Sequence, residues 1–343
     1  MRTRLAVAFL TAVGLTWGAG HALGQATAPE EKSFRSVDGV KLTGLFHKSA
    51  KGAGGPVVLR LHPRGADPHE PVWGDTATTL AANGYNVLRL IFRGHGDPKK
   101  ANSLEVDPAV FWANPYNKNG VRLKPGQNYA TATTIDHDTF NPKYFPVLVQ
   151  DVAAARNLLD QLNDIGDVNT SSVYLFGVGD AVNLGLLFTA SEWLRERVKP
   201  NVGIAPDTVS VRRPLFPGAD PAGPDIAGGV WIAPARHQSV SSTQLKNWVI
   251  SPYALKMRNE TPMLFVYGEK DIKTGSGADW TRQLWNDVLM IDAKFANGQK
   301  LLPPGQTFKK DIKGTNLTGT KLLGNNLGTE KMVEEFLAAV DKE

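Results

Sequence analysis

The sequence of 343 residues contains no cysteine. A chain without thiols forms no disulfide, holds no metal through thiolates and has no cysteine nucleophile. Long apolar runs are also missing beyond the first residues, where a bilayer span needs about 20 consecutive apolar positions. Its stability must therefore come from a buried core, for which a hydrophobic content of 42% provides ample material.

A strong charge of either sign is absent as well. The formal net charge is +5, and the lysines and arginines are scattered along the chain rather than clustered. Nucleic-acid partners are recognised by basic patches, so we expect none here. No motif indicates a cofactor, and the sequence says nothing about the oligomeric state.

The N-terminus has the pattern of a signal peptide. Met1–Arg4 is basic, residues 5–19 are apolar, and small residues surround Gly24 and Ala26. We expect cleavage near Gly24 or Ala26, an acidic linker over 27–32 and a periplasmic or secreted protein with no stable membrane span. A membrane anchor is the alternative, but the apolar run is short for a bilayer.

Alternating apolar strands and amphipathic helices predict a single α/β domain over 27–343 with a parallel sheet. Two stretches interrupt this rhythm and resemble lid insertions: about 97–146, with many Pro, Asn, Lys and Tyr, and about 198–226, rich in Pro and Gly. An Asp38-Gly39 turn predicts a hairpin of residues 32–37 and 40–46. Further strands are expected at 56–61, 85–92, 173–178, 227–233, 262–267 and 307–312, and helices at 73–83, 145–162, 181–197, 251–259, 279–290 and 329–340.

The chain is organised around residues 173–185, an apolar strand that runs through small residues into a helix. This is the form of a nucleophile elbow, in which a Gly-x-Ser-x-Gly sequence holds a serine on a strained turn. Gly177 and Ala181 occupy the outer small positions. The central position, where the serine would stand, is Gly179.

These features resemble the α/β-hydrolase superfamily over essentially the whole mature length. The matching pieces are the hairpin, the turn after Leu61-His62, Arg93–Gly96, the elbow and the strand that leads to Asp271. The resemblance implies an eight-stranded, mostly parallel sheet with helices on both faces and a pocket at its carboxyl edge. Arg93–Gly96 and the stretches at 106–108, 111–112 and 191–193 are also similar to a group of exported bacterial members.

The resemblance further implies a nucleophile, an acid and a histidine in that chain order. Asp271 follows a strand at the acid's position, although an aspartate that caps a turn is the alternative. None of the seven histidines lies after Asp271, and the turn expected to carry the base, 313–319, contains Asn316 and threonines instead. The arrangement thus lacks both its nucleophile and its base.

Asp180 is the reactive side chain of the elbow, and some relatives, haloalkane dehalogenases and epoxide hydrolases, use an aspartate nucleophile. Centring the motif on Asp180 places the β-branched Val178 and Val182 at the small-residue positions, which disfavours that role. In the expected register Asp180 follows the nucleophile position and offers its backbone amide to the oxyanion hole.

The pocket loops carry further candidates. His62, Arg64 and Gly65 lie in the loop expected to supply the second oxyanion donor, and His95 lies in the next one. We interpret both histidines as structural. Arg64 is either a solvated surface residue or a binding group for a carboxylate or phosphate.

Two other features need an explanation. Asp136-His137-Asp138 has metal-ligating residue types, but neighbours on one loop without a partner motif are a weak signal, and we predict no metal site. Arg60 and Arg89 fall inside expected buried strands, where they either extend past a helix to solvent or pair with a buried acid.

The preferred hypothesis is an exported protein with a degenerate site, non-catalytic, that binds a small molecule or a partner in the remnant pocket. The alternative is a hydrolase of altered mechanism, acting on an ester, epoxide or haloalkane through Asp180, Asp271 or His95. A third hypothesis is an interaction module that presents 97–146 and 198–226. The missing serine and histidine disfavour a conventional serine esterase.

Overall fold

The computed structural model describes residues 28–96, 105–197, 215, 218–249, 255–289 and 307–341. The predicted signal peptide and its cleavage positions lie outside the described residues. The predicted acidic linker over 27–32 is wrong in part, because strand β1 already begins at Glu30. Glu30 pairs there with Lys32 and Lys48, so its charge is partly compensated on the strand.

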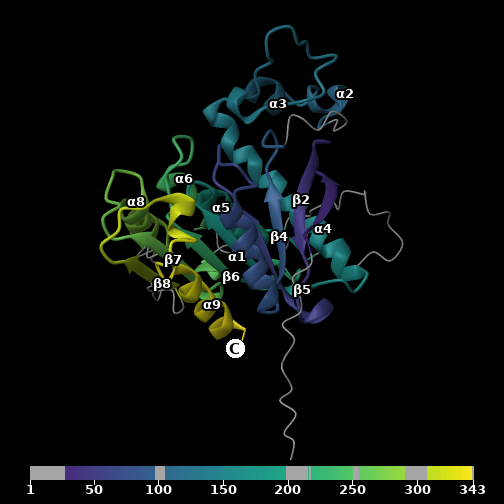
Figure 1. Cartoon of the computed structure of the whole chain (residues 1–343). Coiled ribbons are helices and arrows are strands. Elements are labelled where there is room, and N and C mark those ends of the chain that lie inside the picture. The colour runs from purple at the N-terminus through teal and green to yellow at the C-terminus, as the bar shows by residue number, and fades with distance from the viewer. Residues whose placement is uncertain are drawn as a thin grey trace, which may run out of the picture.

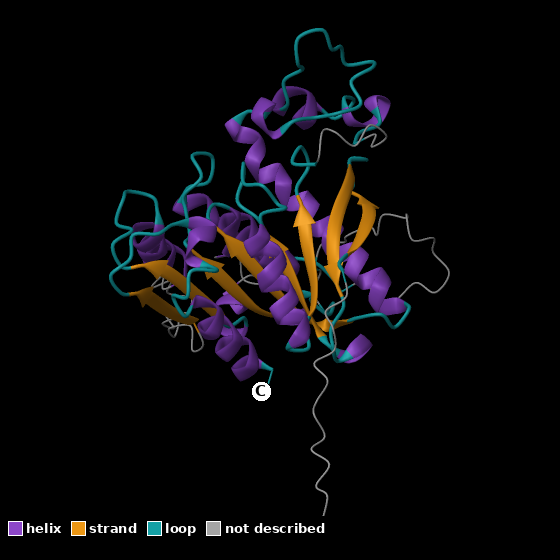
Figure 2. Ribbon diagram, viewed as in Figure 1, coloured by secondary structure: helices purple, strands orange, loops and turns teal. Residues whose placement is uncertain are grey.

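Eight strands form one sheet in the order β1-β2-β4-β3-β5-β6-β7-β8 (Figures 1 and 2). β1 and β2 form the predicted antiparallel hairpin, β2 is antiparallel to β4, and all later pairs are parallel. The sheet expected from the sequence is therefore confirmed. The strands are β1 Glu30–Arg35, β2 Lys41–His47, β3 Pro56–Leu61, β4 Asn86–Ile91, β5 Asn169–Val178, β6 Ile226–Ile232, β7 Met263–Gly268 and β8 Thr307–Ile312.

Helices cover both faces of the sheet. On one face, α1 and α9 pack over Val58, Phe176 and Val266. On the other face, α4 and α5 cover the larger apolar cluster. The α-helices are α1 Pro71–Ala82, α2 Pro108–Phe111, α3 Pro115–Gly120, α4 Val149–Asp164, α5 Ala181–Trp193, α6 Ser242–Val249, α7 Leu255–Glu260, α8 Gly277–Gln283 and α9 Thr329–Val340.

Two predicted helices have wrong boundaries, and one helix was not predicted. α5 ends at Trp193 rather than Arg197, because Leu194 to Glu196 turn away and Glu196 forms a bridge with Pro221. The segment predicted as one helix over 145–162 is a 3₁₀ segment, Pro142–Leu148, followed by α4, with Pro146 inside the first part. α6 was not predicted. None of the described helices is long and apolar enough to span a membrane.

Of the first predicted insertion, residues 105–146 are described, and they carry α2, α3 and the 3₁₀ turn His137–Thr139. They lie beyond the carboxyl ends of β3 and β4, at the top of Figure 1. Of the second, residues 215 and 218–226 are described, including a 3₁₀ turn over Gly223–Asp225 that leads into β6.

Neither explanation offered for Arg60 and Arg89 holds. Arg60 is 1% exposed and donates to the backbone oxygen of Trp73, with its guanidinium 4.5 Å from the Trp73 ring. Arg89 donates to the backbone oxygen of Pro68. The two side chains are 1% and 7% exposed, and neither guanidinium forms an ion pair with a described carboxylate.

Arg93, directly after β4, is the centre of a buried polar network. Its guanidinium contacts Asp151 of α4 at 2.6 Å and Asp38 of the hairpin turn at 2.6 Å, and its backbone amide also donates to Asp151. Tyr144 accepts from Arg93 and donates to Asn117 of α3. Asp38, predicted as a turn residue only, is thus buried beneath the inserted segment. The network joins the hairpin, β4, the insertion and α4.

Replacing Arg93 by methionine is expected to lower the free energy of unfolding by about 3–5 kcal/mol, because two buried carboxylates lose their counter-charge. Urea unfolding of Arg93→Met beside the exposed-site control Arg35→Met measures this difference. The control should remain within about 0.5 kcal/mol of the parent protein. An Arg93→Met protein that matches the control would contradict the proposed role of the network.

Candidate functional site

The elbow lies at the carboxyl end of β5, where the chain turns into α5. Gly179 has φ +62°, donates to Ile232 and accepts from the backbone amide of Ala235 at 3.0 Å. A Cβ at this position would lie 3.3 Å from Pro63, close to the limit for real contacts. A left-handed conformation favours glycine. The turn therefore has the strained shape of an elbow, with no side chain at its centre.

The small residues around the turn bring α5 close to the sheet. A Cβ on Gly185 would lie 2.4 Å from the Trp231 ring of β6, and one on Gly177 would lie 3.1 Å from it. Trp231 is fully buried. The glycines that mark the motif in the sequence thus make room for this ring.

Asp180 folds back over the loop that follows β3. Its Oδ1 accepts the backbone N–H of Arg64 at 2.9 Å. In the expected geometry, an amide of this loop and the amide of Asp180 would together stabilise a developing oxyanion. Here the loop amide is already bonded to a carboxylate of the protein itself.

The environment of Asp180 opposes its negative charge. Burial raises the pKa of its carboxyl to about 6, against the opposing effects of the Arg64 amide and the Arg64 guanidinium. Because burial disfavours the charged form, an ionised Asp180 lowers the stability of the fold. Carboxyls with raised pKa values are typical of functional sites rather than of solvated surfaces.

Asn183, on the first turn of α5, is a site residue that the sequence analysis missed. Its amide donates to the backbone oxygens of Asp180 and Ala235, and its oxygen accepts from the Trp280 indole of α8 at 2.9 Å. It is fully buried. The signal in the sequence was an asparagine among the apolar residues that begin the helix. In the structure, Asn183 fixes the elbow to the loop after β6.

His62 and His95 are both held by the backbone. In His62, Nδ1 donates to Pro63 and Nε2 accepts from the amide of Phe92. In His95, Nδ1 donates to Arg93 and Nε2 accepts from the amide of Gly65 at 3.0 Å. Burial lowers their pKa values to about 3 and about 4. Both nitrogens of each ring are engaged, so neither ring can take a proton from a substrate without breaking a loop contact.

Arg64 extends between two further histidines. Its guanidinium lies 3.4 Å from the backbone oxygen of His137 and 3.5 Å from Nε2 of His237. His237 stacks on Phe145, and its Nδ1 accepts from the amide of Ser239. Arg64 is partly exposed, so its interpretation as a solvated surface residue stays a prediction. Its guanidinium forms no ion pair with a described carboxylate.

Asp271 lies directly after the turn that ends β7, away from the histidines just described. Its Oδ1 accepts from Ser276 at 2.6 Å, and its backbone oxygen accepts from Ala278. Its buried Oδ2 has no hydrogen-bond partner. The turn at 313–319 reaches the same region through a bond from Lys270 to Thr315. Asp271 thus shapes the turn into α8, and no described imidazole contacts it.

An open cavity of about 1350 Å³ lies at the carboxyl end of β4, between the loop that follows β3 and the inserted segment. Neither the elbow nor Arg64 lines it. Glu105 forms part of its wall and accepts from the amides of Gly94 and Ile135. Burial raises the pKa of Glu105 to about 7. Charged groups of both signs line the cavity, among them Lys41, Asp67, Lys124 and Asp136.

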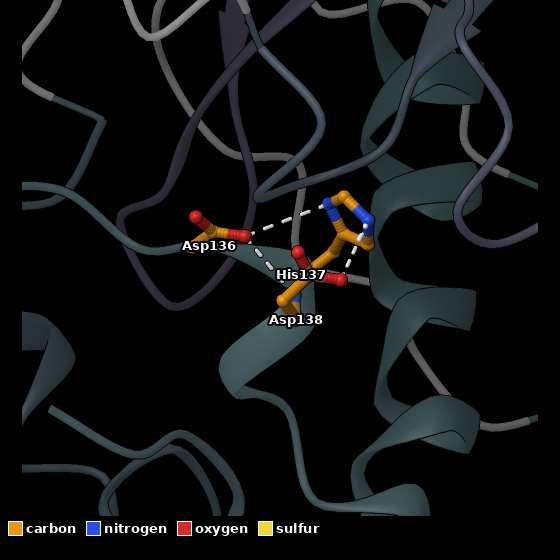
Figure 3. Close-up of side chains that lie close together, drawn as sticks. All are labelled: Asp136, His137 and Asp138. Atoms are coloured by element: carbon orange, nitrogen blue, oxygen red, sulfur yellow. Dashed lines mark hydrogen bonds and ion pairs between the residues drawn. The ribbon is translucent and has the colours of Figure 1, made fainter. Parts of the chain in front are cut away.

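Asp136, His137 and Asp138 bring three possible metal-ligand atoms within 4.8 Å of one another (Figure 3). Two of these residues are already engaged. Asp136 accepts from Lys124 at 2.6 Å and from the amide of Asp138, and Nδ1 of His137 donates to Gly94. Nε2 of His137 and the exposed Asp138 carboxylate lie 3.2 Å apart and contact each other, so fewer than the three protein ligands of a typical zinc site are open. The donor set does not fit a resident metal.

No protein-family model and no curated protein matches the sequence. Solved structures do match its fold. DcsB in complex with a substrate analogue shares 12% identity over 92% of this chain and 99% of its own, with a TM-score of 0.51. Est1E from Butyrivibrio proteoclasticus with bound ferulic acid shares 10% identity over 91% and 100%, also at 0.51. GrgF from Penicillium sp., an α/β hydrolase, shares 10% identity over 92% and 99%, at 0.50. The chain has the α/β-hydrolase fold.

Replacing Asp180 by asparagine is expected to stabilise the protein at neutral pH. Because the folded pKa is raised, the contribution of Asp180 to stability is fully present below about pH 4 and is lost as the pH rises through about 6. Asp180→Asn retains the acceptor for Arg64 without the charge, so it should gain about 2 kcal/mol at pH 7.5 and almost nothing at pH 4. Urea unfolding at both pH values measures this, with the exposed Asp75→Asn as control. A loss of stability at pH 7.5 would contradict the assignment.

Proposed function

We propose that this chain is an exported, non-catalytic protein of α/β-hydrolase fold that binds a small anionic molecule beside its elbow. The observation that best supports this proposal is the hydrogen bond from the Arg64 amide to the Asp180 carboxylate. This amide is one of the two donors expected to stabilise an oxyanion, and a carboxylate of the protein already accepts from it. A substrate carbonyl would have to displace a charged group that belongs to the fold.

Two further observations support the absence of acyl transfer. Gly179 offers no nucleophile at the turn, and both ring nitrogens of His62 and His95 are bonded to the backbone. Nucleophilic catalysis needs a nucleophile and a base within hydrogen-bond reach of each other. The described residues bring no such pair together at Gly179.

Arg64 provides the chemistry for binding. A guanidinium presents a planar set of donors that matches carboxylates and phosphates. Its contacts at 3.4 and 3.5 Å are long, and they go to a backbone oxygen and an imidazole rather than to an acid. A ligand carboxylate or phosphate would replace these weak contacts with charge-assisted hydrogen bonds. Export rests on the pattern of the first 26 residues.

The competing proposal is a hydrolase of altered mechanism that uses Asp180. The raised pKa of this carboxyl is compatible with acid–base work. Its Oδ1, however, is bonded to the Arg64 amide, which lowers its nucleophilicity, and no described base is placed to activate a water beside it. Retained ester, epoxide or haloalkane turnover by the parent protein, lost in Asp180→Asn, would favour this alternative.

A fluorophosphonate probe is expected to leave the native protein unlabelled, and also the Gly179→Ser variant. Restoring the hydroxyl does not restore a base, so the serine stays unactivated. The variant should be destabilised by about 1–2 kcal/mol, because a side chain at φ +62° is strained. Gel fluorescence against a heat-denatured control measures the labelling. Labelling of the native parent chain would overturn the non-catalytic assignment.

Binding of an anionic probe should depend on Arg64. Calorimetric titration with benzoate and phenyl phosphate, beside the neutral benzamide, separates charge recognition from apolar contact. Arg64→Met is expected to weaken binding of the two anions about tenfold or more, because a charged hydrogen bond is lost. The exposed Arg122→Met is the matched control and should bind as the parent chain does. Equal binding of benzamide, or no effect of Arg64→Met, would contradict the proposal.

A further inference from the structure

Two buried arginines stand side by side inside the sheet. Arg60 of β3 and Arg89 of β4 are partners in the parallel register, so their side chains leave the same face at neighbouring positions. They are 1% and 7% exposed. This face is the one covered by α1, because Val58 and Val87, two residues before each arginine, belong to the apolar cluster beneath that helix.

The packing holds both guanidinium groups in place through neutral hydrogen-bond acceptors, and Asp67 exerts only a through-space effect on the pKa of Arg89, which burial lowers. Arg60 lies between two rings, 4.5 Å from Trp73 and 4.8 Å from Phe176, and donates once to the Trp73 backbone. Arg89 donates once to the Pro68 backbone. Both acceptors are neutral carbonyl oxygens. Arginine stays protonated in proteins, so two positive charges remain on this face.

Several buried donors around these charges have no partner. They are Nε and Nη2 of Arg60, Nε of Arg89 and the indole N–H of Trp73, and Nε2 of His47 is also unpartnered. His47 lies near both arginines, whose charges, after burial itself, lower its pKa to about 4. A buried donor without a partner costs about 1–3 kcal/mol, and more when it is charged. Such a concentration of unpaired donors is unusual in a folded protein.

The start of α1 adds to the positive potential. Trp73 and Gly74 lie in its first turn, where the helix dipole is positive. A Cβ on Gly74 would lie 3.6 Å from Nη1 of Arg89, so the helix approaches this guanidinium through a position without a side chain. Gly74 is itself partly exposed, which leaves this position open toward solvent.

We propose that this cluster, Arg60, Arg89, His47 and Trp73, is a buried binding site for a small monovalent anion of the size of chloride. The anion would accept from the unpartnered N–H groups and neutralise part of the charge that the chain leaves uncompensated. The dense packing of Arg60 between two rings favours a single small ion over an organic ligand. This site lies on the α1 face of the sheet and is separate from the binding function proposed for Arg64.

The test is the dependence of thermal stability on the kind of anion at constant ionic strength. The full mature chain, exchanged into sodium gluconate, is titrated with sodium chloride or bromide. A ligand that binds only the folded state raises the melting temperature in proportion to the logarithm of its concentration once that exceeds Kd. We expect a rise of about 2–4 °C between 1 and 100 mM chloride.

Variants assign the effect to the cluster. Arg60→Met keeps an unbranched side chain between the two rings and should lose the chloride-dependent rise. Arg64→Met and Arg122→Met should retain it. Should Arg60→Met fail to fold, anomalous diffraction from crystals grown in bromide should place an ion within about 3.5 Å of the two guanidinium groups. A melting temperature that follows ionic strength alone, a chloride-specific rise that survives Arg60→Met, or water at that position would each overturn the proposal.

Discussion

The contact of Arg93 with Asp38 and Asp151 is the constraint on which the arrangement of the site depends. One guanidinium meets carboxylates from the hairpin turn and from α4, two elements more than 100 residues apart. Because Arg93 directly follows β4, the network also sets the path of the next residues. Gly94 and His95 then bond to Glu105, His137 and Gly65 of neighbouring loops. A chain without cysteine fixes its loops here with buried charge rather than with disulfides.

The fold was predictable because its signals are local. Apolar strands, the Asp38-Gly39 turn and the small residues around Gly179 each follow from a few neighbouring positions, and the sheet confirms them. The wrong boundary after α5 has a tertiary cause, the bridge from Glu196 to Pro221. The wrong boundary before α4 has a local one, Pro146 inside the 3₁₀ segment.

The site was less predictable, since its contacts cross the chain. The bond from Arg64 to Asp180 spans 116 positions, and the bonds of Asn183 to Trp280 and of Asp38 to Arg93 span 97 and 55. The residue types were visible in the sequence, but no local pattern assigns their partners. In contrast, the sequence alone shows that position 179 is not serine and that no histidine follows Asp271, because neither observation depends on a contact.

The elbow retains the elements that give the turn its shape while its chemistry is altered. Gly179 still adopts the left-handed conformation, and Gly177 and Gly185 still admit Trp231. The carboxylate of Asp180, however, accepts the hydrogen bond of the Arg64 amide, which acyl transfer would need as an oxyanion donor. If the chain had kept the turn only for folding, a neutral residue at Asp180 would serve better, because burial disfavours the charge. Retaining the charge beside the Arg64 guanidinium is consistent with a site that recognises charge.

Three arginine environments show how partners decide what the same side chain does. Arg93 meets two acids within the fold and acts as a structural joint. Arg64 meets an imidazole and a carbonyl oxygen at long range and remains available to an external anion. Arg60 and Arg89 are buried beside each other and donate to carbonyl oxygens only, so neither has a carboxylate partner in direct contact. Burial makes an unpaired charge costly, and the need for an anion therefore increases from Arg93 through Arg64 to the Arg60–Arg89 pair.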